Sequence, residues 1–151
     1  MSEKKHENHY ENTGIATKAI HYAQETEKWD SRCVIPPIVL SSTFKLYDTS
    51  PYIYGRLGNP TRDTLEKALA ALENAKFGLC FSSGMGAITT ASYLVGAGNH
   101  VILADNVYGG TSRFYNTFAP ENGIEVDNVD MTDLQNVSKA LKTNTKVHIN
   151  L

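Results

Sequence analysis

The sequence predicts an α/β fold with a mostly parallel sheet, and three observations carry that prediction. From about residue 59 onward, short apolar runs alternate with stretches of helical periodicity. Turn-forming residues separate them, as at residues 96–99 and at Asn122-Gly123. Strands that alternate with helices in this order pair in parallel through right-handed crossovers.

The leading part of the chain lacks this periodicity. Residues 1–12 are polar and are expected to form a disordered tail. Residues 13–58 contain a short helical stretch near 17–23, followed by Pro36-Pro37, and otherwise no regular pattern. So long an irregular segment is unusual inside a compact domain. We expect it to be an N-terminal arm that contacts a partner subunit, ahead of an α/β domain over residues 59–151.

The first clear helix begins at Asn59-Pro60, because Asn can cap free N–H groups and Pro needs no donor at the first position. Its predicted apolar face repeats at i, i+3, i+4 and i+7, and consists of Leu65, Ala68, Leu69 and Leu72. The elements expected after it are a buried strand over 77–81, a helix over 87–95, a strand over 100–104, a helix over 111–118, a strand over 124–129, a helix over 133–141 and a strand over 146–149.

Composition excludes several classes of function. The 14 basic and 16 acidic residues leave a net charge of −2, and no basic cluster favours nucleic acid. Cys33 and Cys80 have neither disulfide-framework nor metal-site spacing, so no metal site is expected. No apolar run approaches the ~18 residues of a membrane span, and the beginning lacks a signal-peptide pattern. We expect a cytoplasmic protein without membrane or nucleic-acid partners.

The strongest candidate site is the loop over residues 82–86, where a predicted strand gives way to a helix. Its glycines let the backbone approach a phosphate, and free N–H groups at a helix start favour negative charge. Ser82 or Ser83 could add a hydroxyl donor. A plain turn without a ligand is the alternative, and a dinucleotide site is disfavoured because Thr89 stands at the third glycine position. A single phosphate monoester fits this loop better than a pyrophosphate.

Two further segments could contribute. Tyr108, among small residues after the next predicted strand, could stack on a flat heterocycle, and Arg113 could pair with a carboxylate. Upstream, Tyr54 and Arg56 stand two residues apart, on one side of an extended segment, where they could clamp a phosphate. Taken alone, Tyr108 is equally well a packed aromatic and Arg113 a surface cation, whereas the pair of Tyr54 and Arg56 would more often be a chance surface pair than a site.

Together, these segments resemble the Cys/Met-metabolism enzymes that depend on pyridoxal phosphate (PLP), a fold-type I family, and within it the cystathionine γ-lyase group. The resemblance extends from Gly14 to about Val147. It is carried, in order, by ATKAIH at 16–21, VIPPI at 34–38, STF at 42–44, YGRLGNPT at 54–61, LE at 65–66, SGM at 83–85 and DNVYGGT at 105–111.

The resemblance implies an incomplete PLP-dependent-transferase large domain and assigns roles to the candidate residues. The cofactor, pyridoxal 5′-phosphate, would be bound by Tyr54 and Arg56 from a neighbouring subunit and, within the subunit, by Ser83, Gly84, Met85 and Tyr108. Tyr108 is the catalytic candidate because it stacks on the cofactor ring. The substrate-binding candidates are Arg56, Tyr108 and Arg113. The family is homotetrameric, so a homo-oligomer that binds an amino-acid substrate is expected.

The implied activity is a PLP-dependent carbon–sulfur lyase of transsulfuration, which converts cystathionine to cysteine, 2-oxobutanoate and ammonia. Cystathionine γ-synthase, methionine γ-lyase, O-acetylhomoserine sulfhydrylase and a non-catalytic truncated isoform are the alternatives. The family's Schiff-base lysine stands in a Ser-x-Thr-Lys context, which this sequence does not contain. We therefore expect an N-terminal portion of the enzyme that is inactive by itself.

Overall fold

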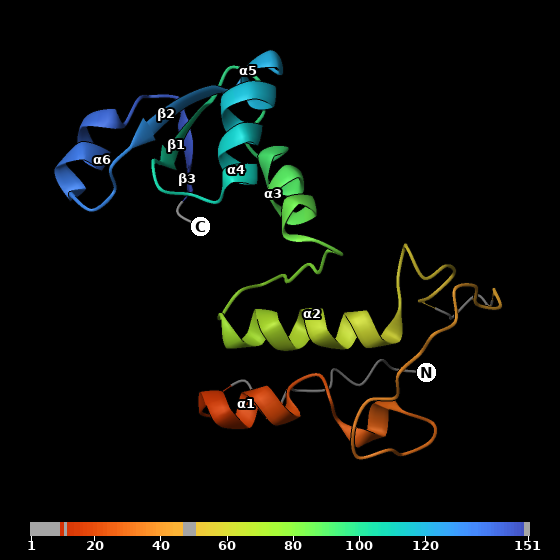
Figure 1. Ribbon diagram of the computed structural model, residues 1–151. Helices are drawn as coiled ribbons and strands as arrows, with labels where there is room; N and C mark the ends of the chain where they lie inside the picture. Colours follow the sequence, from red (N-terminus) through yellow and green to blue (C-terminus); the bar gives the residue numbers. More distant parts are fainter. Residues whose placement is uncertain (1–9, 11, 47–50, 150–151) are drawn as a thin grey trace. The chain divides into compact units, whose positions relative to one another are not determined.

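The computed structural model describes residues 10, 12–46 and 51–149, and the chain divides into two compact units (Figure 1). The first unit covers residues 1–80 and the second covers residues 81–151. Most of the predicted disordered tail lies outside the described residues. The first helix of the predicted α/β domain falls in the unit that contains the predicted arm, whereas the sheet forms the other unit.

The described residues of the first unit form three helical elements, of which α1 and α2 lie side by side (Figure 1). They are α1 (Ile15–His21), the 3-10 helix η1 (Thr26–Lys28) and α2 (Pro60–Leu72). The predicted start of α2 is confirmed: the Asn59 side chain accepts hydrogen bonds from the backbone N–H groups of Thr61 and Arg62, at 2.9 and 3.4 Å, and Pro60 occupies the first helical position.

The buried side of α2 differs from the predicted apolar face. Ala68 and Ala70 are buried, whereas Leu65 and Leu69 are 50% and 44% exposed. Small side chains at the buried positions allow a neighbouring backbone to approach closely, and α1 is the element that packs against α2. The two leucines are therefore only about half covered within this unit.

The predicted buried strand over 77–81 is wrong. These residues form no regular element, and Phe77 and Leu79 are 75% and 71% exposed. A strand requires a neighbouring backbone for its hydrogen bonds, and the described residues supply none here. The backbone N–H of Cys80 instead donates to the Glu66 side chain of α2, at 2.9 Å.

The second unit contains the predicted parallel sheet. Its elements are α3 (Gly84–Ser92), β1 (His100–Ala104), α4 (Gly109–Arg113), the π-helix η2 (Phe114–Phe118), α5 (Ala119–Glu121), β2 (Glu125–Val129), α6 (Leu134–Ala140) and β3 (Thr145–Ile149). The strands pair in parallel in the order β2-β1-β3. The strand-helix alternation predicted for this part of the chain is confirmed, with bounds that differ by a few residues.

The helix predicted over 111–118 is part of a longer, interrupted helical segment. The chain passes from α4 through one π-helical stretch, η2, into α5. Pro120 lies in α5 and has no N–H to donate, so the regular pattern of α-helical hydrogen bonds is interrupted there. The widened turn keeps Tyr115 in the core, where it is 1% exposed.

Strand β1 is the centre of the core, and every one of its residues is buried. The apolar cluster around it consists of Val95, Val101, Leu103, Tyr115, Ala119, Ile124 and Ile149. Each large buried side chain contributes roughly 1.5–3 kcal/mol relative to an exposed one. No helix in the described part of the chain is both long and apolar enough to cross a lipid bilayer.

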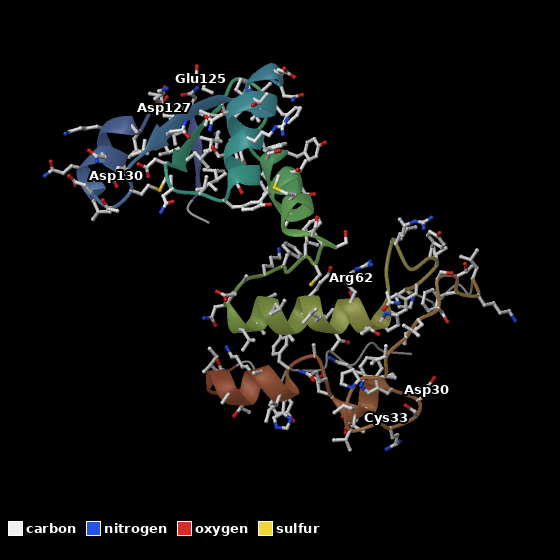
Figure 2. The ribbon with its side chains drawn as sticks, viewed as in Figure 1. Asp30, Cys33, Arg62, Glu125, Asp127 and Asp130 are labelled. Atoms are coloured by element: carbon white, nitrogen blue, oxygen red, sulfur yellow. The ribbon has the colours of Figure 1, made fainter. Side chains whose placement is uncertain are left out.

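A polar contact joins the three strands where they begin. The buried His100 ring contacts Thr145 of β3 through Nδ1, at 2.8 Å, and Asp127 of β2 through Nε2, at 3.2 Å. Lys142 lies 2.9 Å from the same Asp127 carboxylate, and 3.6 Å from that of Glu125. Figure 2 shows Glu125 and Asp127 on β2. The hydrogen bond from Lys142 is the main reason that the pKa of Asp127 lies below its ordinary value of 3.8.

We expect Asp127→Asn to destabilise the second unit at pH 7, because a carboxylate with a lowered pKa stabilises the fold above about pH 4. That stabilisation is lost as the pH falls through the lowered value. The loss at pH 7 should not exceed about 1 kcal/mol, because the Asp127 side chain is 40% exposed and water screens its pairs. Urea unfolding of both chains at pH 7 and at pH 3 measures this difference in the free energy of unfolding.

The difference between Asp127→Asn and the unchanged chain should shrink at pH 3. Glu121→Gln serves as the control, because Glu121 is exposed and has no ion pair in the described part of the chain. An equal difference at both pH values would contradict the electrostatic explanation.

Candidate functional site

The beginning of α3 leaves backbone donors free. Ser83 is the N-cap, and its hydroxyl accepts a hydrogen bond from the Gly86 N–H at 3.1 Å. The cap starts the helix at Gly84, so the glycines predicted to form a loop belong to the first helical turn. Among the described residues, the N–H groups of Gly84 and Met85 have no acceptor. Free N–H groups and the positive end of the helix dipole favour an anion here.

A hollow of about 550 Å³ opens beside this helix start. It is lined by Ser83, Gly84, Met85, Ala87, Ile88, Tyr108 and Thr111. There is open space beside Gly84, since a Cβ atom added there would meet nothing within 4 Å. None of the lining residues carries a negative charge that would repel a phosphate, and most of the walls are apolar. Such a hollow suits a group with one anionic end and a flat apolar body.

Tyr108 forms one wall of the hollow from the N-cap of α4. Its side chain is 69% exposed. The position depends on Gly110, where an added Cβ would lie 2.6 Å from a Tyr108 ring carbon and 3.0 Å from the Met85 sulfur. Gly110 therefore allows the ring to lie over the first turn of α4, next to the helix start of α3.

The structure brings four of the predicted residues to one place. Ser83, Gly84, Met85 and Tyr108 line the same hollow. Arg113, the last residue of α4, is exposed and is not among the residues that line it. Its predicted role with substrate stays a prediction.

Tyr54 and Arg56 belong to the first unit and contact each other. The Arg56 guanidinium lies over the Tyr54 ring, 4.3 Å from its centre. Tyr54 forms an isolated antiparallel bridge with Thr43, and residues 55–57 form a turn. The expected extended segment is therefore wrong, and it is the turn that brings the two side chains together. Their predicted role at a neighbouring subunit stays a prediction.

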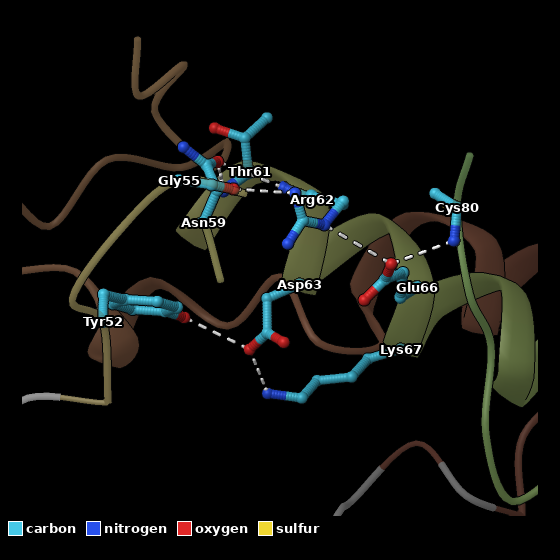
Figure 3. Close-up of polar contacts among 9 residues, drawn as sticks. All are labelled: Tyr52, Gly55, Asn59, Thr61, Arg62, Asp63, Glu66, Lys67 and Cys80. Carbon is cyan, nitrogen blue, oxygen red and sulfur yellow. Dashed lines mark hydrogen bonds and ion pairs between the residues drawn. The ribbon is translucent and has the colours of Figure 1, made fainter. Parts of the chain in front are cut away.

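Sequence reasoning missed the contacts that hold this turn (Figure 3). Arg62, on the first turn of α2, donates to the Gly55 carbonyl at 2.8 Å, and its Nε lies 3.5 Å from Glu66. Glu66 also accepts from the Cys80 N–H. The i, i+4 spacing of Arg62 and Glu66 was the available signal. Through these contacts α2 holds both the turn with Arg56 and the segment that ends at Cys80.

A second set of contacts lies on the same helix (Figure 3). The Tyr52 hydroxyl donates to Asp63 at 3.1 Å, and Lys67 lies 2.6 Å from the same carboxylate. Burial of the phenol, reinforced by the Asp63 charge and hydrogen bond, raises the pKa of Tyr52 to about 12. Tyr52 is therefore a neutral donor at physiological pH and a structural anchor.

Comparison with protein families identifies the chain's relatives. The sequence model of the family described as "Cys/Met metabolism PLP-dependent enzyme" matches residues 16–149. The chain is 45% identical over 136 residues to the cystathionine gamma-lyase of Homo sapiens, covering 88% of this chain and 34% of that protein. It is 44% identical over 137 residues to the "Probable cystathionine gamma-synthase" of Herpetosiphon aurantiacus, covering 89% and 43%.

Solved structures support the same relationship. The crystal structure of metB from Corynebacterium glutamicum superposes with a TM-score of 0.82 and 36% identity, covering 91% of this chain and 37% of that one. The chain thus spans about a third to two fifths of the length of these relatives.

Proposed function

Because the chain belongs to the Cys/Met metabolism PLP-dependent enzyme family, we propose that it is the leading part of a carbon–sulfur lyase that acts on cystathionine. The products would be cysteine, 2-oxobutanoate and ammonia, with one water consumed. The cofactor of the family is pyridoxal 5′-phosphate. The observation that carries the proposal is the hollow at the start of α3, which combines free backbone donors with an exposed aromatic ring.

The residues of the hollow fit the cofactor at both of its ends. The free N–H groups of Gly84 and Met85 and the Ser83 hydroxyl would hold the phosphate. Tyr108 would stack on the ring and keep water from one face, which contributes roughly 1 kcal/mol. When bound, the cofactor supplies an electron sink for the substrate's α-carbon. Because Tyr108 would touch the reacting ring, we propose it as the catalytic residue of this segment.

We further propose that a second copy of the chain completes the site. Tyr54 and Arg56, held together by the turn, would reach the phosphate and the substrate of a neighbouring subunit. Arg113 would pair with a substrate carboxylate. We also propose that the protein assembles as a homotetramer and lies in the cytoplasm.

The catalytic step needs a lysine that the 151 residues do not contain in the expected Ser-x-Thr-Lys context. That lysine would hold the cofactor covalently and move the substrate's α-proton. We propose that the activity belongs to the longer polypeptide, and that the segment alone binds the cofactor without turnover.

Cystathionine γ-synthase is the second candidate activity, because identity to the synthase relative (44%) nearly equals identity to the human lyase (45%). Methionine γ-lyase, O-acetylhomoserine sulfhydrylase and a non-catalytic isoform remain further alternatives. The test is to purify the product of the native reading frame and to assay it with cystathionine, methionine and O-acetylhomoserine. 2-Oxobutanoate from cystathionine at the highest kcat/KM supports the lyase, whereas preference for either other substrate rejects it.

Gly110→Ala should weaken cofactor binding because the new methyl group would displace the Tyr108 ring. The probe is pyridoxamine 5′-phosphate, which carries no aldehyde and so forms no adducts with surface lysines. Loss of the stacking contact should raise its Kd about 5- to 10-fold, measured by equilibrium dialysis against the 151-residue chain.

Gly109→Ala is the matched control, because a Cβ atom at Gly109 would meet nothing within 4 Å. It should leave the Kd unchanged. Equal Kd values for the two variants would show that the Tyr108 ring does not contact the probe.

A further inference from the structure

Thr111 has a buried hydroxyl group with no hydrogen-bond partner. It is 0% exposed, and its Oγ1 atom has no partner among the described residues. The other buried polar side chains of the second unit, Ser92 and His100, each have at least one polar contact, although His100 Nε2 makes no hydrogen bond to any described residue. Ser92 donates to the Thr89 carbonyl at 2.7 Å, and His100 contacts Thr145 and Asp127. Folded proteins seldom leave such a group unpaired, because burial removes its hydrogen bonds to water.

The usual intrahelical solution is missing for Thr111. A helical threonine commonly donates to the carbonyl four residues earlier, as Thr64 does to Pro60 at 2.9 Å. For Thr111 that carbonyl belongs to Val107, which precedes the N-cap Tyr108 and lies outside α4. The carbonyl three residues earlier belongs to the N-cap Tyr108 and accepts the Ser112 N–H at 3.0 Å, and the Thr111 hydroxyl does not donate to it.

The location of the hydroxyl points to a ligand. Thr111 lines the hollow together with Ser83, Gly84, Met85 and Tyr108. Met85 is half-buried and Tyr108 is exposed, and both line the hollow beside Thr111. Two independent observations thus converge on one place: free donors at the start of α3, and a buried hydroxyl without a partner.

We infer that Thr111 is a further cofactor-binding residue, whose hydroxyl donates its hydrogen bond to an oxygen atom of the bound cofactor, on the phosphate or on the ring. This inference rests on the proposed binding of the cofactor to the hollow. Thr111 then adds a side-chain donor from α4 to the backbone donors of α3. The bound cofactor would thereby contact both α3 and α4.

The test compares Thr111→Val with Thr111→Ser in the 151-residue chain. Valine keeps the shape of threonine but removes the hydroxyl, whereas serine keeps the hydroxyl. Thr111→Val should raise the Kd for pyridoxamine 5′-phosphate about 10-fold, and Thr111→Ser should stay within about 3-fold of the unchanged chain. Thr90→Val is the control, because Thr90 is exposed on α3 and is absent from the hollow.

Thermal unfolding without ligand supplies the second readout. Because the hydroxyl has no partner in the free chain, Thr111→Val should unfold at the same or a higher temperature. A lower unfolding temperature for Thr111→Val would show that the hydroxyl is bonded within the protein, and would overturn the inference. An unchanged Kd for Thr111→Val would overturn it as well.

Two further comparisons show which part of the cofactor Thr111 contacts, and whether a negative result concerns Thr111 or the whole cofactor site. Inorganic phosphate as the probe places the contact: a weaker phosphate Kd for Thr111→Val assigns it to the phosphate, and an unchanged one, beside a weaker pyridoxamine 5′-phosphate Kd, assigns it to the ring. If the unchanged chain binds no pyridoxamine 5′-phosphate at all, the proposed cofactor site itself is rejected, which is distinct from a failure of Thr111 alone.

Discussion

The burial of β1 between β2 and β3 is the constraint on which the second unit depends. Every residue of β1 is buried, so both neighbouring strands must pair with it in a fixed register. His100 reinforces that register because its ring contacts both neighbours. Ile88 of α3 and Phe114, directly after α4, pack against the same apolar cluster. The hollow forms between α3 and α4 because both helices are held by one core.

The stability of the core allows polar groups to remain unpaired at the hollow. The N–H groups of Gly84 and Met85 and the hydroxyl of Thr111 have no partner among the described residues. Of these groups only the Thr111 hydroxyl is fully buried, and an unpaired buried hydroxyl costs about 1–3 kcal/mol, which a ligand that accepts its hydrogen bond would recover. Gly110 shapes the hollow, because only a residue without a Cβ atom lets the Tyr108 ring lie so close.

Local sequence signals predicted the elements whose stability is local. The Asn59-Pro60 start of α2 and the apolar run of β1 are confirmed at the expected residues. Helix capping and strand burial each require particular residue types, so both can be recognised in the sequence. Residues 77–81 are as apolar as β1, yet they form no strand. Whether an apolar run becomes a strand depends on pairing with segments distant in the chain. Hydrophobicity alone does not distinguish these two cases.

The sequence predicted only part of the candidate site, namely the residues that stand in recognisable motifs. Ser83, Gly84, Met85 and Tyr108 stand in short motifs, and the structure brings them to one hollow. Thr111 was quoted within a motif but was given no role, because the absence of a hydrogen-bond partner is a property of the folded chain. Tyr54 and Arg56 were predicted to lie on one side of an extended segment, whereas they contact each other at a turn that depends on Arg62 of α2.

The central claim is that the start of α3 binds the phosphate of a pyridoxal-type cofactor. Equilibrium dialysis of the chain against pyridoxamine 5′-phosphate and against pyridoxamine, which lacks the phosphate, tests it most directly. The account predicts that the phosphorylated compound binds at least about 10-fold more tightly, because only its phosphate can use the free N–H groups of the helix start. Equal affinity for the two compounds, or no binding of either, would contradict it.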